Sequence, residues 1–191
     1  VLDEEHDVRR LGGKAKINPP VRPRAEVEGL WRQVAAGHIW LVSTDHVSWT
    51  ADRKTDPDML ANASGVPGLE AMVPLFVKGA LERGVPLTSA ARLMSANPAR
   101  HFRIDDRKGN LAAGLDADII VMTPEPYVYE AAASGHNVVD WSPYDGMTMP
   151  WRVAATYLRG KQVYDGRAVL AEPGNGRFIR PPLTRAIAST A

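Results

Sequence analysis

The feature that most constrains the fold is a helical pattern that leads straight into a short apolar run. Residues 24–36, RAEVEGLWRQVAA, carry apolar side chains at helical spacing, and Gly37 is a natural stop for a helix. HIWLVST, at 38–44, is a nearly continuous apolar run, typical of a parallel strand that is covered on both faces. A helix that leads into such a strand indicates an α/β fold built on a parallel sheet. The buried stripe of the helix is expected to consist of Val27, Leu30, Trp31 and Val34.

The neighbouring segments extend this order of elements. KINPPVRP, at 16–23, predicts a short strand at Lys16–Asn18, because the prolines that follow lack N–H groups for pairing. Residues 69–83 and 87–97 predict two helices, the second of which closes before Pro98. The apolar residues expected inside are Trp31, Trp40, Met72, Leu75, Phe76 and Leu81.

After Phe102 the pattern changes from helical to β. KGNLAAGLDADIIVMTP and VAATYLRGKQVYDGRAVL are β-branched runs that are broken by glycine turns. The second run predicts a hairpin joined at residues 159–161, Arg-Gly-Lys. A small β unit is therefore expected to follow the α/β unit.

The composition excludes several classes of protein. Twenty-three Lys plus Arg and twenty-two Asp plus Glu give a net charge of +1, so there is no electrostatic reason to expect a nucleic acid or an anionic membrane as partner. No run approaches the roughly 18 apolar residues of a membrane span. The chain has no cysteine, which excludes disulfides, thiolate catalysis and cysteine-based zinc sites. We expect a soluble, cytoplasmic protein.

Asp45 is the first candidate for chemistry, because it ends the apolar run at 38–44 and opens a long loop at 45–68. In parallel α/β folds ligands meet the carboxyl ends of the strands. An acid there can bind a divalent metal, accept a proton from a metal-bound water, or do both. The alternative is that Asp45 only caps the next turn. His46 is open to a similar structural reading, and the other histidines show no H-x-H or H-x-x-x-H spacing that would form a metal site.

Asn18 and Ser64 are candidates for substrate binding. Each lies in a loop beside proline or glycine, where backbone groups can meet a polar ligand. On the residues alone, simple turn formation is the first explanation for both. The charge run Asp52-Arg53-Lys54 is expected to form a solvated face.

The order of these segments resembles the cyclic amidohydrolases, in particular the group of hydantoinase, dihydropyrimidinase and allantoinase. The likeness covers almost the whole chain. It is carried by INPPVR (17–22), STDH (43–46), SGVPGLE (64–70), NPAR (97–100), RKGNLAAGLDADIIV (107–121), WSPYDGM (141–147) and the YLRGKQVYDG hairpin (157–166).

The resemblance implies the carboxyl-terminal portion of a TIM-type (β/α)₈ metal-dependent hydrolase barrel plus part of a small β-sandwich. It places the last barrel units at 1–101, the sandwich portion at 102–180 and a tail at 181–191. It also implies a site with two zinc ions that opens a cyclic amide. Asp45 matches the acid that contacts a metal and moves the proton, while the backbone at Asn18 and Ser64 matches groups that hold the ring's imide. A histidine follows the acid in many members of the group, and His46 matches it, but no role is assigned to His46.

The family's H-x-H pair, its bridging carboxylated lysine and its two further histidines would all precede INPPVR. None is present here. We therefore expect the 191-residue chain alone to retain no metal and to be inactive. Its apolar faces would need cover from the missing amino-terminal part or from another copy, as in a homo-oligomer.

Three alternatives to a hydantoinase or dihydropyrimidinase follow from the same likeness. Allantoinase stays open. Dihydroorotase is less favoured, because a further histidine is expected where this chain has Ser48 and Trp49. A non-catalytic, dihydropyrimidinase-like assembly protein is the alternative of another class. The identity of the cyclic amide and of the metal is not fixed by these residues.

Overall fold

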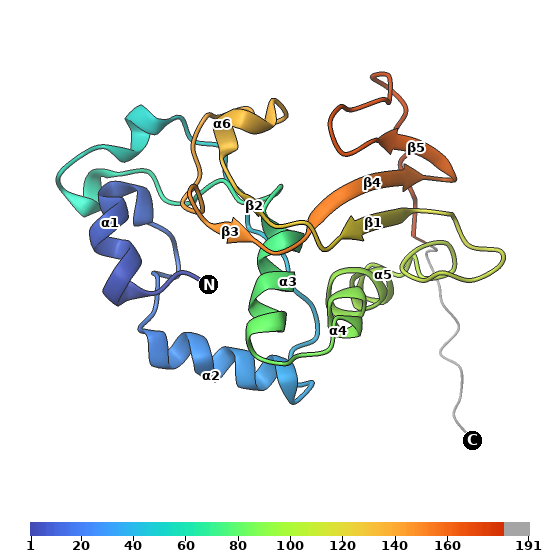
Figure 1. Ribbon diagram of the computed structural model, residues 1–191, viewed down its shortest axis with the longest axis horizontal. Coiled ribbons are helices and arrows are strands. Elements are labelled where there is room, and N and C mark those ends of the chain that lie inside the picture. The colour runs from blue at the N-terminus through green and yellow to red at the C-terminus, as the bar shows by residue number, and fades with distance from the viewer. Residues whose placement is uncertain (182–191) are drawn as a thin grey trace. The chain divides into compact units, whose positions relative to one another are not determined.

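The structure is a computed structural model that describes residues 1–181 (Figure 1). The chain folds into two compact units. The first unit contains Val1–Leu87 and Pro124–Arg152, and the second contains Thr88–Thr123 and the chain from Val153 onward. The expected tail, apart from Pro181, lies outside the described residues. The expected boundary between barrel units at 1–101 and a sandwich portion at 102–180 refers to the domains of a whole enzyme, and it stays a prediction.

Most of the regular elements of the first unit are helices. Its elements are η1 (Glu4–Val8), α1 (Arg9–Leu11), η2 (Gly12–Ala15), α2 (Arg24–Ala35), η3 (Ala51–Lys54), η4 (Met59–Ala61), α3 (Met72–Glu82), β2 (Tyr127–Val128), α6 (Ala131–Ser134) and β3 (Thr148–Met149). The strands β2 and β3 pair antiparallel. A small core forms where α3 meets this ribbon, from Ala71, Leu75, Tyr129, Ala131 and Met149.

The helices α2 and α3 confirm the predicted helices and contact each other through Trp31. The centroids of the Trp31 and Phe76 rings lie 5.3 Å apart. A Cβ placed on Gly79 would lie only 2.1 Å from the nearest atom of the Trp31 ring. Glycine at 79 therefore allows the close approach. The Arg83 guanidinium lies 5.0 Å from the same indole and donates to Glu28 of α2 at 2.8 Å, so a charged pair also joins the two helices.

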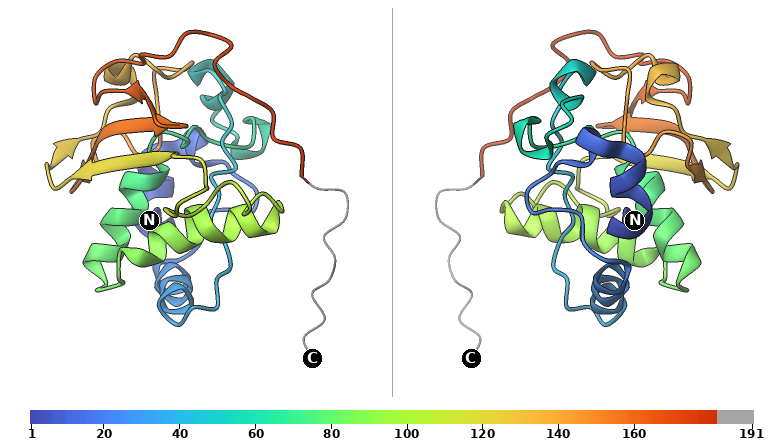
Figure 2. Two further views of the ribbon diagram at one scale, coloured as in Figure 1. Left: turned by 90° about the vertical axis from the view of Figure 1, so that its right-hand side faces the viewer. Right: turned by 90° about the vertical axis from the view of Figure 1, so that its left-hand side faces the viewer.

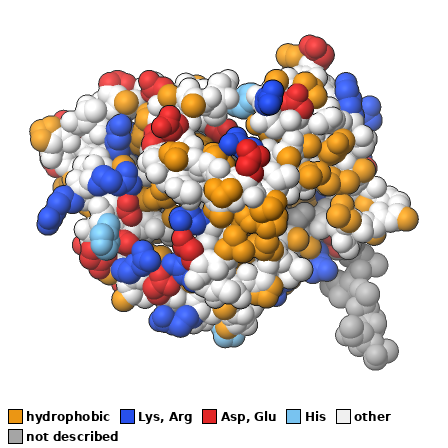
Figure 3. All heavy atoms as spheres, viewed as in Figure 1, with side chains coloured by type: hydrophobic (Ala, Val, Ile, Leu, Met, Phe, Trp, Pro, Cys, Tyr) orange, Lys and Arg blue, Asp and Glu red, His pale blue; other side chains and the backbone are white. Residues whose placement is uncertain are grey.

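The start of the chain is held by a buried carboxylate. Asp3 is 2% exposed, accepts the His6 N–H at 2.9 Å as an N-cap, and pairs with the Arg24 guanidinium at 3.0 Å. Burial acts to raise the pKa of Asp3, but the hydrogen bonds from His6 and Arg24 outweigh it and lower the pKa to about 2. Over η1, α1 and α2, Figure 3 shows acidic and basic side chains interspersed.

The second unit has a three-stranded sheet, in the order β1 (Ile119–Thr123), β4 (Arg152–Leu158) and β5 (Lys161–Tyr164), with its strands side by side in Figure 2. The predicted hairpin is confirmed: β4 and β5 pair antiparallel. Arg159 and Gly160 both have positive φ, at 51° and 78°, as a tight hairpin turn of this kind requires.

The helix predicted over 87–97 runs further than expected. It continues as α4 (Thr88–Ala91), η5 (Arg92–Ala96) and α5 (Asn97–His101), so it does not close before Pro98. The Asn97 N–H bonds to the carbonyl of Arg92, five residues back, and Pro98 follows in the first turn of α5. A proline there is tolerated because it removes no required N–H.

Two predicted strands, Lys16–Asn18 and 38–44, are not strands in the described residues. A strand forms only when a neighbour takes up its N–H and C=O groups, and all strands of the described residues lie after Asp118. Three side chains expected inside are also exposed: Leu30, Trp40 and Leu81. No helix within residues 1–181 is both long and apolar enough to cross a membrane.

Candidate functional site

Three loops that carry the predicted site residues are joined by hydrogen bonds in the first unit. The Gly65 N–H donates to the Lys16 carbonyl at 3.0 Å, which joins the loop of Ser64 to the segment before Asn18. The loop after Asp45 is joined to the loop of Ser64 by the Val47 N–H, which donates to the Val66 carbonyl at 3.1 Å. The predicted residues therefore belong to one local cluster of loops, although each is far from the others in sequence.

The loops of Asp45 and Ser64 are also joined by side chains. The Trp49 indole donates to the Ser64 carbonyl at 2.8 Å. A carbonyl oxygen has two lone pairs, so this bond does not exhaust the capacity of the Ser64 carbonyl to accept hydrogen bonds. Asn18 is exposed and Ser64 is half-buried, so both stand where a small molecule can reach them.

Asp45 stands at the surface in an uncommon backbone conformation. It is exposed, and its φ is 45°, in the left-handed region that Asp tolerates better than most residues. Among the described residues its carboxylate forms no hydrogen bond or ion pair, so both oxygens are available to solvent or a ligand. The turn at Asp45 is fixed from its carboxyl side, because the His46 N–H donates to the Thr44 hydroxyl at 3.2 Å.

His46 has a structural role that the sequence left open. Its Nδ1 accepts the Gly68 N–H at 3.0 Å and the Leu69 N–H at 3.2 Å. An accepting Nδ1 carries no proton, so the neutral ring carries its proton on Nε2. The imidazole therefore ties the turn at Asp45 to the segment that leads into α3.

Lys54 is buried, and the expectation of a solvated charge run was wrong for it. Its side chain is 1% exposed, and its Nζ donates to the carbonyls of Lys16, Ala63 and Gly65 at 2.7, 2.6 and 3.0 Å. Burial lowers the pKa of Lys54 to about 8, and the nearby Lys16 charge acts in the same direction. These three acceptors require an ammonium rather than a carboxylated, metal-bridging lysine.

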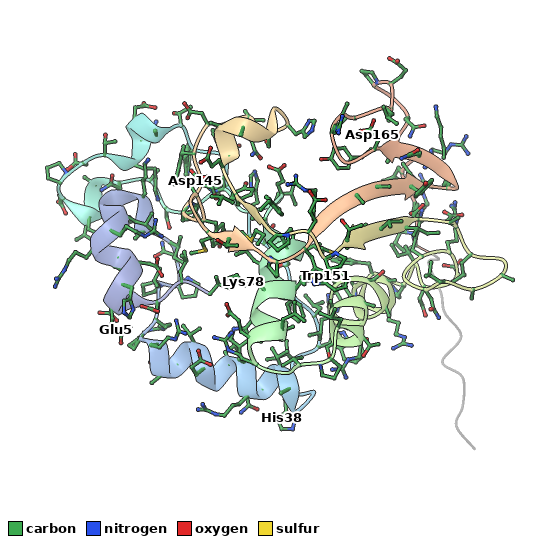
Figure 4. The ribbon with its side chains drawn as sticks, viewed as in Figure 1. Glu5, His38, Lys78, Asp145, Trp151 and Asp165 are labelled. Carbon is green, nitrogen blue, oxygen red and sulfur yellow. The ribbon has the colours of Figure 1, made fainter. Side chains whose placement is uncertain are left out.

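The WSPYDGM segment at 141–147, which is far from these loops in sequence, also bonds to them. The buried Trp141 indole donates to the Trp49 carbonyl at 2.8 Å, and the Ser142 hydroxyl donates to the Pro67 carbonyl at 3.1 Å. Asp145, labelled in Figure 4 in the turn before β3, accepts the N–H groups of Ser142 and Ala131, both at 2.8 Å. The segment therefore holds the loops through the Trp141 and Ser142 donors.

The described residues do not fit a binuclear zinc site. Within residues 1–181, no three histidine or acidic side chains gather where they could hold a metal ion. Asp45 alone offers one carboxylate, while a stable divalent site takes three or four protein ligands.

Comparisons with known proteins identify the family. The family model described as "Amidohydrolase family" matches residues 9–163. The chain belongs to the amidohydrolase family. This family member is 38% identical over 182 residues to the allantoinase of Rubrobacter xylanophilus, a match that covers 95% of the chain and 40% of the allantoinase. It is 33% identical over 174 residues to the dihydroorotase of Methanosarcina mazei, covering 91% of the chain and 38% of the dihydroorotase.

The fold of this amidohydrolase family member agrees with that of a solved relative. A structure of D-hydantoinase matches it with a TM-score of 0.85 and 33% identity, over 92% of this chain and 40% of that one. The family and the mixed α/β fold class are therefore confirmed. The chain spans about 40% of the length of the relatives it matches.

The sequence missed the residues that hold the site together. The sequence predicts Lys54 in a solvated charge run and assigns no role to Trp49 or Trp141. The one available signal for Lys54 is its place between Trp49 and the glycine-containing segment 64–68. This pattern does not distinguish a buried ammonium from an exposed one.

Proposed function

We propose that this chain is part of a metal-dependent cyclic amidohydrolase and carries its general acid/base, Asp45. The observation that supports this most is the joining of three loops: those of Asn18, Asp45 and Ser64 are held together by direct hydrogen bonds. Catalysis requires such groups to be held in a fixed relation to one another.

The proposed chemistry is the opening of a cyclic amide by water. Water adds to the ring carbonyl carbon, and Asp45 takes the proton that water loses. The C–N bond of the ring then breaks, and Asp45 returns the proton to the departing nitrogen. Backbone N–H and C=O groups at Asn18 and Ser64 pair with the imide of the ring and hold the ring in the site.

The proposal that the enzyme uses a metal rests on the family alone. Two zinc ions are expected in the whole enzyme, with Asp45 as one contact. The residues described here do not supply the other ligands, so the proton transfer at Asp45 is proposed from this chain's residues alone.

The substrate class is a five- or six-membered cyclic amide such as hydantoin, a dihydropyrimidine or allantoin. The relatives are an allantoinase at 38% identity and a hydantoinase of matching fold, and both names describe ring-opening enzymes. Dihydroorotate is the second candidate, because a dihydroorotase is 33% identical. We further propose a cytoplasmic protein that works as a homo-oligomer or in association with the remainder of the enzyme.

The test is complementation. The 191-residue chain is purified alone and together with the part of the Rubrobacter allantoinase that it does not match, with zinc supplied. Hydrolysis of hydantoin, dihydrouracil, allantoin and dihydroorotate is then measured. We expect turnover of one ring by the mixture only. Absence of turnover on all four rings, in a mixture that forms a complex and binds zinc, would favour the non-catalytic assembly protein.

A further inference from the structure

The buried ammonium of Lys54 has no part in the chemistry proposed above. Its three acceptors, the carbonyls of Lys16, Ala63 and Gly65, lie within 3.0 Å. A lysine ammonium carries three N–H donors, so the number of donors equals the number of acceptors. The side chain is therefore satisfied as a cation by backbone carbonyls.

The positions of these acceptors relate Lys54 to the proposed ring-binding groups. Ala63 and Gly65 are the two neighbours of Ser64, and Lys16 stands two residues before Asn18. One cation thus contacts the backbone on both sides of Ser64 and the segment that leads to Asn18. Together with the Gly65 N–H bond to the Lys16 carbonyl, it fixes the spacing between the two segments.

The backbone of Lys54 is itself held against η2. A Cβ placed on Gly13 would lie 2.6 Å from the Lys54 carbonyl oxygen and 2.5 Å from the side-chain oxygen of Asn62. Asn62 is also buried and bonds to the backbone of Asp56 and Asp58. The backbone that carries the ammonium is therefore closely packed against Gly13 and Asn62.

The charge of Lys54 is costly at this place. Among the described residues it forms no ion pair, and only carbonyl dipoles compensate the burial of the cation. An apolar side chain at 54 would avoid the burial of a charge but would leave the carbonyls of Lys16, Ala63 and Gly65 without this donor. The ammonium is therefore tied to the placement of these three carbonyls.

We propose that Lys54 is a positioning residue of the site, whose ammonium holds the backbone at Asn18 and Ser64 at the spacing that binds the imide of the ring. This inference rests on the proposed function for the identity of the ligand. The hydrogen bonds that define the positioning stand on the structure alone.

The first experiment measures the positioning without any substrate. Amide hydrogen exchange is followed by NMR in the 191-residue chain and in Lys54→Met, with Lys78→Met as the control. Lys78, labelled in Figure 4, pairs with Glu82 on the surface of α3, so the control removes the same charge from the same unit. We expect the Gly65 amide to exchange roughly tenfold faster in Lys54→Met only, as hydrogen bonds are lost. The Leu75 amide, which bonds within the first unit to Ala71, should be unchanged in both.

The second experiment measures binding in the complemented enzyme described above. Loss of positioning should raise KM roughly tenfold and change kcat far less, because the groups at Asn18 and Ser64 bind the ring rather than transfer protons. Lys78→Met should leave both constants unchanged. Lys54→Gln keeps an N–H donor, so its KM should rise by less than that of Lys54→Met. This variant replaces Lys54→Met in the comparison if Lys54→Met does not fold.

Equal exchange at Gly65 in the wild-type chain and the Lys54 variants would overturn the inference, and so would a fall in kcat at constant KM. An inactive wild-type mixture would count against the proposed function instead. In that case the exchange comparison still decides whether Lys54 holds the two segments.

Discussion

At the scale of single residues, the site depends on side chains that bind backbone groups. His46 is the clearest case after Lys54, because one ring nitrogen accepts two N–H groups from the segment before α3. The oxygen of an asparagine side chain can take the place of Nδ1, while glutamine reaches instead toward the place of Nε2. Replacing His46 with asparagine or with glutamine therefore separates the role of Nδ1 from that of Nε2.

We predict that His46→Asn retains most of the stability of the chain and that His46→Gln loses about 1–2 kcal/mol more, since each net hydrogen bond contributes about 1 kcal/mol. Urea unfolding of the two variants measures the difference. Equal stability of the two variants would show that the Nδ1 contacts contribute nothing.

Asp3 gives a prediction for the dependence of stability on pH. Its pKa is lowered to about 2 in the folded chain, so the carboxylate stabilises the fold above the ordinary pKa of Asp, and this contribution disappears as the pH falls through about 2. Asp3→Asn should therefore be less stable than the wild-type chain at pH 7, and the gap should narrow as the pH is lowered from 5 to 2.

Glu4→Gln, which removes one negative charge from an exposed neighbour, is the control for net charge. Thermal unfolding at a series of pH values gives the comparison. A gap between wild type and Asp3→Asn that stays constant with pH would contradict the role of the ionised carboxylate.

At the scale of elements, glycines in two helices have opposite requirements. Gly79 in α3 lies against the Trp31 ring, which is itself held between Phe76 and the Arg83 guanidinium. Gly29 in α2 has only the far end of the Arg32 side chain nearby, at 3.5 Å from an added Cβ. Alanine improves helix propensity at both positions by about 1 kcal/mol, so the difference between them isolates the packing.

We predict that Gly29→Ala raises the free energy of unfolding by about 0.5–1 kcal/mol. Gly79→Ala should lower it, because over-packing typically costs about 1–3 kcal/mol and exceeds the gain in propensity. Chemical denaturation measures both variants. An increase in stability for Gly79→Ala would mean that Trp31 moves away at little cost.

The elements that the sequence predicted well are those whose partners are near in sequence. The hairpin at Arg159 and the helix at 24–35 need only local hydrogen bonds. The run at 38–44 failed as a strand because β structure depends on a neighbouring strand, and none pairs with it in the described residues. Trp40, expected inside this strand, is 54% exposed for the same reason.

The candidate site was predictable only in part. Asp45, Asn18 and Ser64 are candidates from motif order and stay proposals, while the contacts join the loops that carry them. Lys54 could not be named as buried, because its three acceptors are carbonyls, which every residue type offers and no pattern of side chains reveals.

At the scale of the whole molecule, the central claim is that Asp45 moves the proton when a cyclic amide is opened. Asp52, which is also exposed and lies in the same loop, offers a matched control. Both residues can be changed to asparagine in the complemented enzyme, which removes one negative charge in each case and preserves side-chain size.

The deciding measurement is kcat for ring opening by Asp45→Asn and Asp52→Asn, each with complex formation and zinc content verified. The account predicts that kcat falls by about 10²–10⁴-fold in Asp45→Asn, the usual contribution of a general acid/base, and changes little in Asp52→Asn. A kcat for Asp45→Asn within a few-fold of the wild-type value would contradict it.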